Sequence, residues 1–277
     1  YNFQIMEPQL TTNKFAIPIA IVIAGALIAV ALYFNSTKNV GSNDVGNQKT
    51  DTELANTKIE IAALSANDHF LGNPDAQAVM VVYSDTECPF CKSFHPSTKK
   101  IIDTYGKDGR VALAYRHFPL YKPDSYGRTL HAKAGKEAEA LECANEIGGS
   151  VAFWKYLDRV FEITPSNDGL DPAELPKIAE FSGLDKTAFA NCLNSDKYAD
   201  FISQAYDEAL TAGAQGTPYT IVVLKNKIDE TAKTELQKLA APFPAGTIFA
   251  SDDATKIVIS GGVPYAILEQ IIRIVLK

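Results

Sequence analysis

The chain has 277 residues, with 26 basic and 33 acidic side chains and a net charge of −7 at pH 7. It carries no arginine-rich run and no basic patch, which argues against nucleic acid as a partner. About 220 residues follow an apolar and then polar N-terminal stretch, which is ample for one large core or a domain with an insertion.

The first predicted element is a membrane anchor. Phe15 to Phe34 is an uncharged run of 20 residues, about 30 Å long as a helix and enough to cross a bilayer. Ala29-Val30-Ala31 resembles a signal-peptidase site, but the apolar run is longer than a usual signal-peptide core, so we favour an uncleaved anchor. We expect residues 1–14 to be a short tail and residues 35–57, rich in Asn, Ser and Thr, to be a flexible linker.

Residues 58–277 are predicted to form one α/β domain. Apolar β-branched runs predict strands, and apolar residues three and four apart predict helices. The first expected elements are a short strand at Lys58–Ala63, a buried strand at Val79–Ser84, a helix at Phe90–Tyr105 and a strand at Val111–His117. The last three form a βαβ unit, so the start of its helix lies where ligands and chemistry gather in such sheets.

The second half of the domain is predicted to be helical and then to return to strands. Helical spacing extends from Arg128 to Ala214, broken at Gly148-Gly149, with N-cap signals at Asp171-Pro172 and Asp185. Later strands are expected at Tyr219–Leu224 and Lys256–Ser260, separated by a polar, partly helical excursion at 225–251, and Pro264 opens a final amphipathic helix.

The motif that carries chemistry is Cys88-Pro89-Phe90-Cys91, at the start of the first predicted helix. Two cysteines three apart at a helix start can close a disulfide without moving the backbone, and the first sulfur then faces the unpaired N–H groups of the helix. That position favours a thiolate, the attacking species in thiol–disulfide exchange. The motif therefore predicts a redox site.

The alternative interpretation of the motif is half of a zinc site, with His95 as a third ligand four residues after Cys91. A structural zinc needs a fourth ligand, usually from a second Cys-x-x-Cys or a His pair, and the sequence has neither. We therefore expect no metal at the motif, and His95 is interpreted as a surface helix residue.

A wider pattern resembles a known family. Cys88-Pro89-Phe90-Cys91, a proline five residues after its second cysteine (Pro96) and a Thr217-Pro218 pair opening a later strand together resemble the DsbA-type thiol oxidoreductases of the thioredoxin superfamily. The resemblance covers roughly residues 58–277. It implies an α/β thioredoxin-like fold with a helical insertion at about 125–215, here preceded by a single N-terminal transmembrane helix.

The resemblance also implies residue roles. Cys88 is expected to be the exposed nucleophile and Cys91 the buried resolving cysteine, while Pro89 and Phe90 tune the helix start. Pro218 is expected to be cis and to face the disulfide, which leaves the backbone of Thr217 free to pair with an extended substrate.

The sequence departs from the family at a buried carboxylate that many members carry six residues before the first cysteine. That position is Val82 here. Asp85 and Glu87 are close in sequence and could substitute, but Glu87 would also raise a neighbouring thiol pKa by like-charge repulsion. Phe90 stands where some strong oxidants of the family have histidine, so the oxidising strength stays open.

The remaining cysteines are Cys143 and Cys192, in separate predicted helices. The resemblance and the even count imply that they form a structural disulfide, which would close a loop of about 50 residues and add about 4 kcal/mol in the chain-entropy model. The alternative is two buried free thiols. A bridge fits an oxidising compartment, so we expect a single-pass protein of the cell membrane with its domain outside the cytoplasm.

These observations predict a membrane-anchored thiol–disulfide oxidoreductase that oxidises secreted protein thiols without a cofactor. Its expected partners are reduced or unfolded secreted proteins, the membrane through Phe15–Phe34, and a quinone-linked membrane oxidase that the family implies. Two alternatives remain open: a disulfide reductase or isomerase, and a non-catalytic extracellular binding or metal-carrying module on the same scaffold.

Overall fold

The structure is a computed structural model that describes residues 59–277. The expected anchor at 15–34 and linker at 35–57 lie outside the described residues. Within residues 59–277, no helix combines the length and apolar character needed to cross a bilayer.

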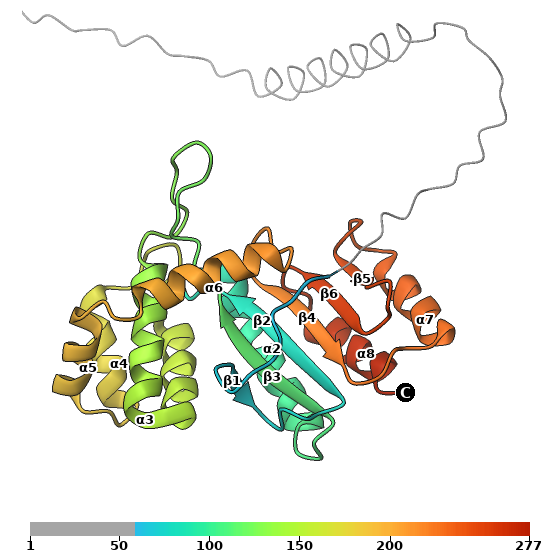
Figure 1. Ribbon diagram of the computed structural model, residues 1–277, viewed down its shortest axis with the longest axis horizontal. Helices are drawn as coiled ribbons and strands as arrows, with labels where there is room; N and C mark the ends of the chain where they lie inside the picture. The colour runs from blue at the N-terminus through green and yellow to red at the C-terminus, as the bar shows by residue number, and fades with distance from the viewer. Residues whose placement is uncertain (1–58) are drawn as a thin grey trace, which may run out of the picture. The chain divides into compact units, whose positions relative to one another are not determined.

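A six-stranded mixed sheet forms the centre of the domain, in the order β1-β3-β2-β4-β6-β5 (Figure 1). Its strands are β1 (His69–Leu71), β2 (Ala78–Ser84), β3 (Val111–His117), β4 (Tyr219–Leu224), β5 (Ile248–Ala250) and β6 (Lys256–Ser260). The β2–β3 pair is parallel and joined through a helix, as the βαβ prediction requires, and the other pairs are antiparallel.

Seven α-helices accompany the sheet within the described residues. They are α2 (Pro89–Tyr105), α3 (Ala134–Ile163), α4 (Leu175–Phe181), α5 (Lys186–Asn194), α6 (Ala199–Thr211), α7 (Glu230–Ala240) and α8 (Tyr265–Val275), with a 3-10 turn, η2, at Pro172–Glu174. Helices α3 to α6 all lie between β3 and β4 in the chain. In Figure 1, α3, α4 and α5 gather on the β1 side of the sheet, whereas α7 lies at its β5 end.

Both faces of the sheet are buried, because alternate residues of each strand enter one of two cores. Met80 and Val82 of β2 belong to the larger core, which also contains buried residues of α2, α3 and α8. Val79 and Val81 belong to the smaller core, which Ala209 of α6 closes on the other face. Val82 is therefore an ordinary core side chain, without a polar role.

The strand predicted at Lys58–Ala63 is wrong. Residues 59–63 are irregular, and β1 at His69–Leu71 pairs with the edge of β3 instead. Side chains supply hydrogen-bond partners for backbone groups of the irregular segment. The N–H of Ala62 donates to Glu208, and Arg116 donates to the carbonyl of Ala62. β1 pairs with residues 113–115 in the middle of the β3 edge, and the earlier segment lies outside the sheet.

The helical region begins later than the sequence predicts, since α3 starts at Ala134 and Leu130 is 65% exposed in the preceding loop. Gly149 interrupts α3 with φ 67°, a left-handed conformation that glycine tolerates, at the predicted break. Asp171 and Asp185 cap η2 and α5, as predicted. The excursion at 225–251 contains helix α7 and all of an extra edge strand, β5.

Candidate functional site

The two cysteines of the motif lie at the start of α2. Cys88 is the N-cap residue with an extended backbone (φ −79°, ψ 121°), and Pro89 occupies the first helical turn, where a missing N–H costs nothing. Both cysteines are buried, with 4% of Cys88 and 2% of Cys91 exposed, whereas Phe90 between them is 67% exposed. The predicted exposure of Cys88 is therefore wrong, because the loop carrying Thr217 lies against its sulfur.

The pKa values of the two thiols are shifted in opposite directions. A hydrogen bond from Cys91 lowers the pKa of Cys88 to about 6, helped by hydrogen bonding to Thr217 and opposed by burial. Burial raises the pKa of Cys91 well above its usual range, and its hydrogen bond to Cys88 raises it further. At neutral pH the reduced pair therefore consists of one thiolate, Cys88, and one thiol, Cys91.

The loop facing Cys88 contains a cis peptide bond between Thr217 and Pro218. When protonated, the Cys88 thiol donates to the carbonyl oxygen of Thr217 at 3.3 Å. The Thr217 hydroxyl is buried and has no other hydrogen-bond partner within residues 59–277, so it can donate to the Cys88 thiolate, the side-chain interaction that lowers the Cys88 pKa. Gly262 also lies at this site: a Cβ there would stand 3.5 Å from the Phe90 carbonyl oxygen and 3.7 Å from Pro218.

Asp85 and Glu87 are both buried in the turn before Cys88, and the side chain of each accepts hydrogen bonds from backbone N–H groups. Asp85 accepts from the N–H of Glu87 and of Leu120 at 2.7 Å, and it pairs with Nδ1 of His131 at 2.8 Å. Glu87 accepts from the N–H of Gly169 at 3.2 Å and of Leu170 at 3.3 Å. Both carboxylates therefore hold the surrounding loops in place.

The loop at 164–170 is a part of the site that sequence reasoning missed. Its N–H at Asn167 donates to the backbone carbonyl of Glu87 at 2.8 Å, directly before the motif. Ser166, Asn167 and Asp168 all have left-handed backbones, with φ of 66°, 54° and 61°. Asn and Asp adopt this conformation more readily than most residues, and the Asn-Asp-Gly run was the available signal.

His131 is a second residue that sequence reasoning missed. It is buried at 3% exposure in the loop before α3. Burial opposes protonation, but the hydrogen bond to Asp85 and the negative charges of Asp85 and Cys88 raise the pKa of His131. A histidine from a distant loop thus faces the Cys88 charge, although the motif itself has Phe90 where a histidine could stand.

Glu137 of α3 is the third missed residue and lies beside Glu87. Burial, followed by a side-chain hydrogen bond with Glu87, raises the pKa of Glu137 to about 9, and Thr86 donates to it at 2.6 Å. Glu137 is therefore protonated at neutral pH and can share its proton with the Glu87 carboxylate. It supplies a buried acid near the motif, whereas the position six residues before Cys88 has only Val82.

We expect Glu137→Gln to change the pH dependence of stability. Unfolded, the carboxyl group has its ordinary pKa near 4.5, so from pH 4.5 upward the folded state holds a proton that the unfolded state releases. Unfolding free energy should therefore fall by about 3 kcal/mol between pH 4.5 and pH 7 from this group, and the loss should continue to about pH 9. Urea titrations across this range should show a profile flatter by that amount in E137Q.

The control for this experiment is Glu162→Gln on the same helix, whose side chain is 64% exposed. Its profile should follow that of the parent. An E137Q profile as steep as the parent's would contradict the raised pKa of Glu137.

His95 is not the surface residue that the sequence predicts, since only 11% of its side chain is exposed. Its Nε2 pairs with Asp158 of α3 at 2.7 Å, and the ring lies against Phe161. In residues 59–277, neither Cys88 nor Cys91 belongs to a group of three side chains placed to hold a metal ion. Nothing in the described structure therefore favours the zinc alternative at the motif.

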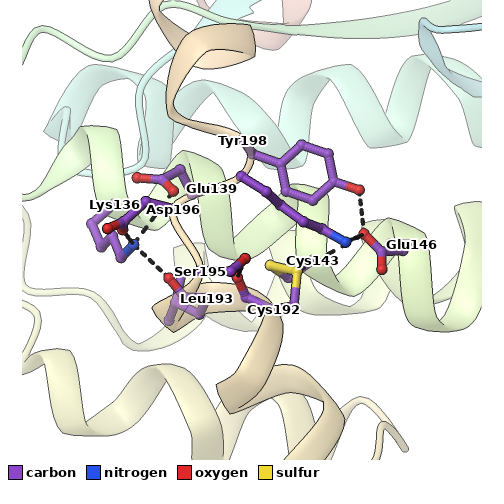
Figure 2. The surroundings of a disulfide bond; sticks show 10 residues. Lys136, Glu139, Cys143, Glu146, Cys192, Leu193, Ser195, Asp196 and Tyr198 are labelled. Atoms are coloured by element: carbon purple, nitrogen blue, oxygen red, sulfur yellow. Dashed lines mark hydrogen bonds and ion pairs between the residues drawn. A yellow bond between two sulfur atoms is a disulfide. The ribbon is translucent and has the colours of Figure 1, made fainter.

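A disulfide joins Cys143 of α3 to Cys192 of α5, with a Cα–Cα distance of 5.8 Å (Figure 2). Polar contacts lie on both sides of it. Lys136 donates to the Leu193 carbonyl at 2.6 Å, and Glu146 accepts from the Tyr198 hydroxyl. The bridge holds two helices of the block between β3 and β4 together, far in sequence from the motif.

Sequence relatives fall into two groups. The chain is 33% identical over 151 residues to the Na(+)/H(+) antiporter NhaA 3 of Salinispora tropica, a match covering 54% of this chain but 21% of that protein. The chain thus spans about a fifth of the length of the antiporter relatives. A Rickettsia prowazekii protein, named provisionally as a protein-disulfide oxidoreductase, is 26% identical over 221 residues, covering 74% of this chain and 75% of that one.

Solved structures show the same fold. Wolbachia pipientis alpha-DsbA1 matches with a TM-score of 0.56 and 22% identity, covering 77% of this chain and 92% of that one. Oxidised BdbD of Bacillus subtilis matches with a TM-score of 0.55 and 19% identity, covering 76% and 93%. The thioredoxin family profile matches residues 64–240. The chain therefore belongs to the thioredoxin family, and its fold is similar to that of the DsbA and BdbD structures.

Proposed function

We propose that the protein is a membrane-anchored thiol–disulfide oxidoreductase that oxidises the thiols of secreted proteins outside the cytoplasm. The observation that carries this proposal is the contrast between Cys88, whose pKa falls to about 6, and the buried Cys91, whose pKa rises. At pH 7 a thiol with a pKa of 9.0 is almost wholly protonated, so lowering the pKa of Cys88 to about 6 stabilises the reduced pair by about 1.4 kcal/mol, or roughly 30 mV. A pair whose reduced form is stabilised is an oxidant.

The proposed reaction transfers one disulfide in two steps. A substrate thiolate attacks Sγ of Cys88 in the Cys88–Cys91 disulfide, a mixed disulfide forms, and Cys91 leaves and takes a proton. A second substrate thiolate then attacks the substrate sulfur, and Cys88 leaves as a thiolate. The substrate loses two electrons and the protein gains them. Because a low-pKa thiol leaves faster, the acidity of Cys88 favours the second step.

The loop at Thr217-Pro218 is the proposed substrate-binding element. It lies against Cys88, and its Thr217 carbonyl accepts from the thiol at 3.3 Å. An extended substrate can pair with this backbone, and the unpartnered Thr217 hydroxyl is available beside it. The exposed Phe90 and the neighbouring Gly262 provide an apolar, uncrowded rim.

The Cys143–Cys192 disulfide supports an oxidising compartment for the domain, with Phe15–Phe34 as the proposed anchor. The proposed clients are reduced secreted proteins, and a quinone-linked membrane oxidase is the proposed source of reoxidation. A reductase or isomerase fed with electrons is the second candidate, because direction depends on the partner as well as on the cysteine pair. The lowered pKa of Cys88 and the raised pKa of Cys91 give the pair one reactive thiolate, which counts against a non-catalytic module.

The decisive experiment is the reduction potential of Cys88–Cys91, measured by equilibration with glutathione buffers. We expect a potential less negative than that of thioredoxin, about −270 mV, with half-maximal alkylation of Cys88 near pH 6. A potential at or below that of thioredoxin would contradict the proposed oxidising direction and favour the reductase.

A further inference from the structure

A buried cluster lies apart from the cysteines and has no role in the proposed exchange reaction. It consists of His69 on β1, His117 at the end of β3, and Glu142 on α3. Oε1 of Glu142 is 2.7 Å from Nε2 of His69 and 2.7 Å from Nε2 of His117. Side-chain exposure is 7% for His69 and Glu142 and 3% for His117. Two imidazoles and one carboxylate therefore converge on a single point inside the fold.

The Glu142 carboxylate has no lysine or arginine partner within residues 59–277; its ion-pairing contacts are the two histidines. Burying a carboxylate is costly unless a cation or several hydrogen bonds compensate for it. Asp68, by comparison, has a side chain that is 5% exposed and pairs with Arg116 at 2.6 Å. The two imidazoles are its hydrogen-bond partners, and a cation between the three side chains would place a full positive charge beside it.

The donor atoms are close to the arrangement that a zinc ion requires. The three candidate ligand atoms lie within 4.8 Å of one another. Tetrahedral zinc, with bonds of about 2.0–2.1 Å, places its ligand atoms roughly 3.3 Å apart. Each Oε1–Nε2 contact of 2.7 Å would therefore have to open by about 0.6 Å, and the widest separation, up to 4.8 Å, would have to close by up to about 1.5 Å. Each imidazole would bind through Nε2 with its proton on Nδ1.

The surroundings both hold the ligands and leave room for a solvent ligand. The ring of His69 stacks on Phe153 with 3.6 Å between centroids, and that of His117 makes an edge contact with Tyr115 at 5.2 Å. A hollow of about 390 Å³ has His69 and Glu142 in its wall. A second hollow, of about 270 Å³, is lined by His69 and His117. An ion can enter from these hollows and keep a water molecule as its fourth ligand.

We propose that His69, His117 and Glu142 form a zinc-binding site with two imidazole ligands, one carboxylate ligand and a fourth position open to water. Its ligands come from the edge strand β1, the central strand β3 and helix α3, so a bound ion would tie the helical block to the sheet. The site adjoins the structural disulfide, since Glu142 precedes Cys143 in the chain. The inference does not depend on the proposed oxidoreductase function.

The test uses zinc titration of the full-length chain carrying Cys88→Ser and Cys91→Ser, so that the thiols cannot bind the metal. After chelator treatment, calorimetry should find one zinc ion per chain, and zinc should raise the melting temperature. Adding Glu142→Gln, His69→Gln or His117→Gln should weaken binding at least 100-fold. The matched control is His95→Gln, which removes another histidine paired to a carboxylate and should leave zinc affinity unchanged.

Cobalt(II) provides a second measurement that does not depend on the stability of the variants. Its visible absorption in the same thiol-free background should show four- or five-coordinate geometry, and zinc should displace it. The proposal is overturned if zinc and cobalt do not bind to this background at 100 µM, in which case the cluster is a hydrogen-bonded core triad. It is also overturned if a folded Glu142→Gln variant binds zinc with unchanged affinity.

Discussion

Replacing Cys91 with serine is expected to trap mixed disulfides between Cys88 and client proteins. Cys88 is the thiolate of the pair, because its pKa falls to about 6, and its sulfur faces the Thr217 loop. With Cys91 absent, a Cys88–client disulfide has no internal thiol to resolve it. Cells producing the variant should yield adducts on non-reducing gels that disappear with dithiothreitol, and turnover in an oxidative refolding assay should fall by several orders of magnitude.

Cys88→Ser is the matched control for this experiment. It should lose turnover as completely as Cys91→Ser but form no adducts, because Cys91 is fully enclosed and burial raises its pKa. Equal adduct formation by the two variants would show that the roles assigned to the two sulfurs are wrong.

Removing the second disulfide is expected to lower stability without affecting exchange. The bridge between Cys143 and Cys192 spans a sequence separation of 49 residues. In the chain-entropy model, a loop of that length contributes about 4 kcal/mol through the unfolded state. The double variant Cys143→Ser/Cys192→Ser, which leaves no unpaired thiol, should therefore melt about 10 °C lower than the parent.

Two measurements separate this structural role from a catalytic one. Thermal unfolding by circular dichroism gives the stability change, and the refolding assay at 25 °C should show exchange within twofold of the parent. Dithiothreitol at a concentration that reduces Cys143–Cys192 should lower the parent's melting temperature towards that of the variant. A tenfold loss of exchange in the folded double variant would assign the bridge a part in the reaction.

Local sequence determined most of the scaffold around the motif. Strands β2, β3, β4 and β6 and helix α2 coincide with the predicted ranges to within one residue, because continuous β-branched runs and helical spacing are local signals. Asp171 and Asp185 cap their helices because a short acceptor side chain satisfies free N–H groups within three residues. The redox site at Cys88-Pro89-Phe90-Cys91 could be predicted for the same reason, because it depends on the spacing of two cysteines within one short segment.

The tertiary structure alone decided which distant residues complete the site. Glu137 and His131 lie more than 40 residues after Cys88, and the loop containing Asn167 contacts Glu87 through backbone atoms that any sequence provides. Likewise, His69, His117 and Glu142 meet only because β1 pairs with β3 and α3 packs beside them. Strand register and helix docking are set by burial summed over the whole core. The burial of Cys88 and its hydrogen bond with Thr217, which both act on the Cys88 pKa, could therefore not be assigned from sequence spacing.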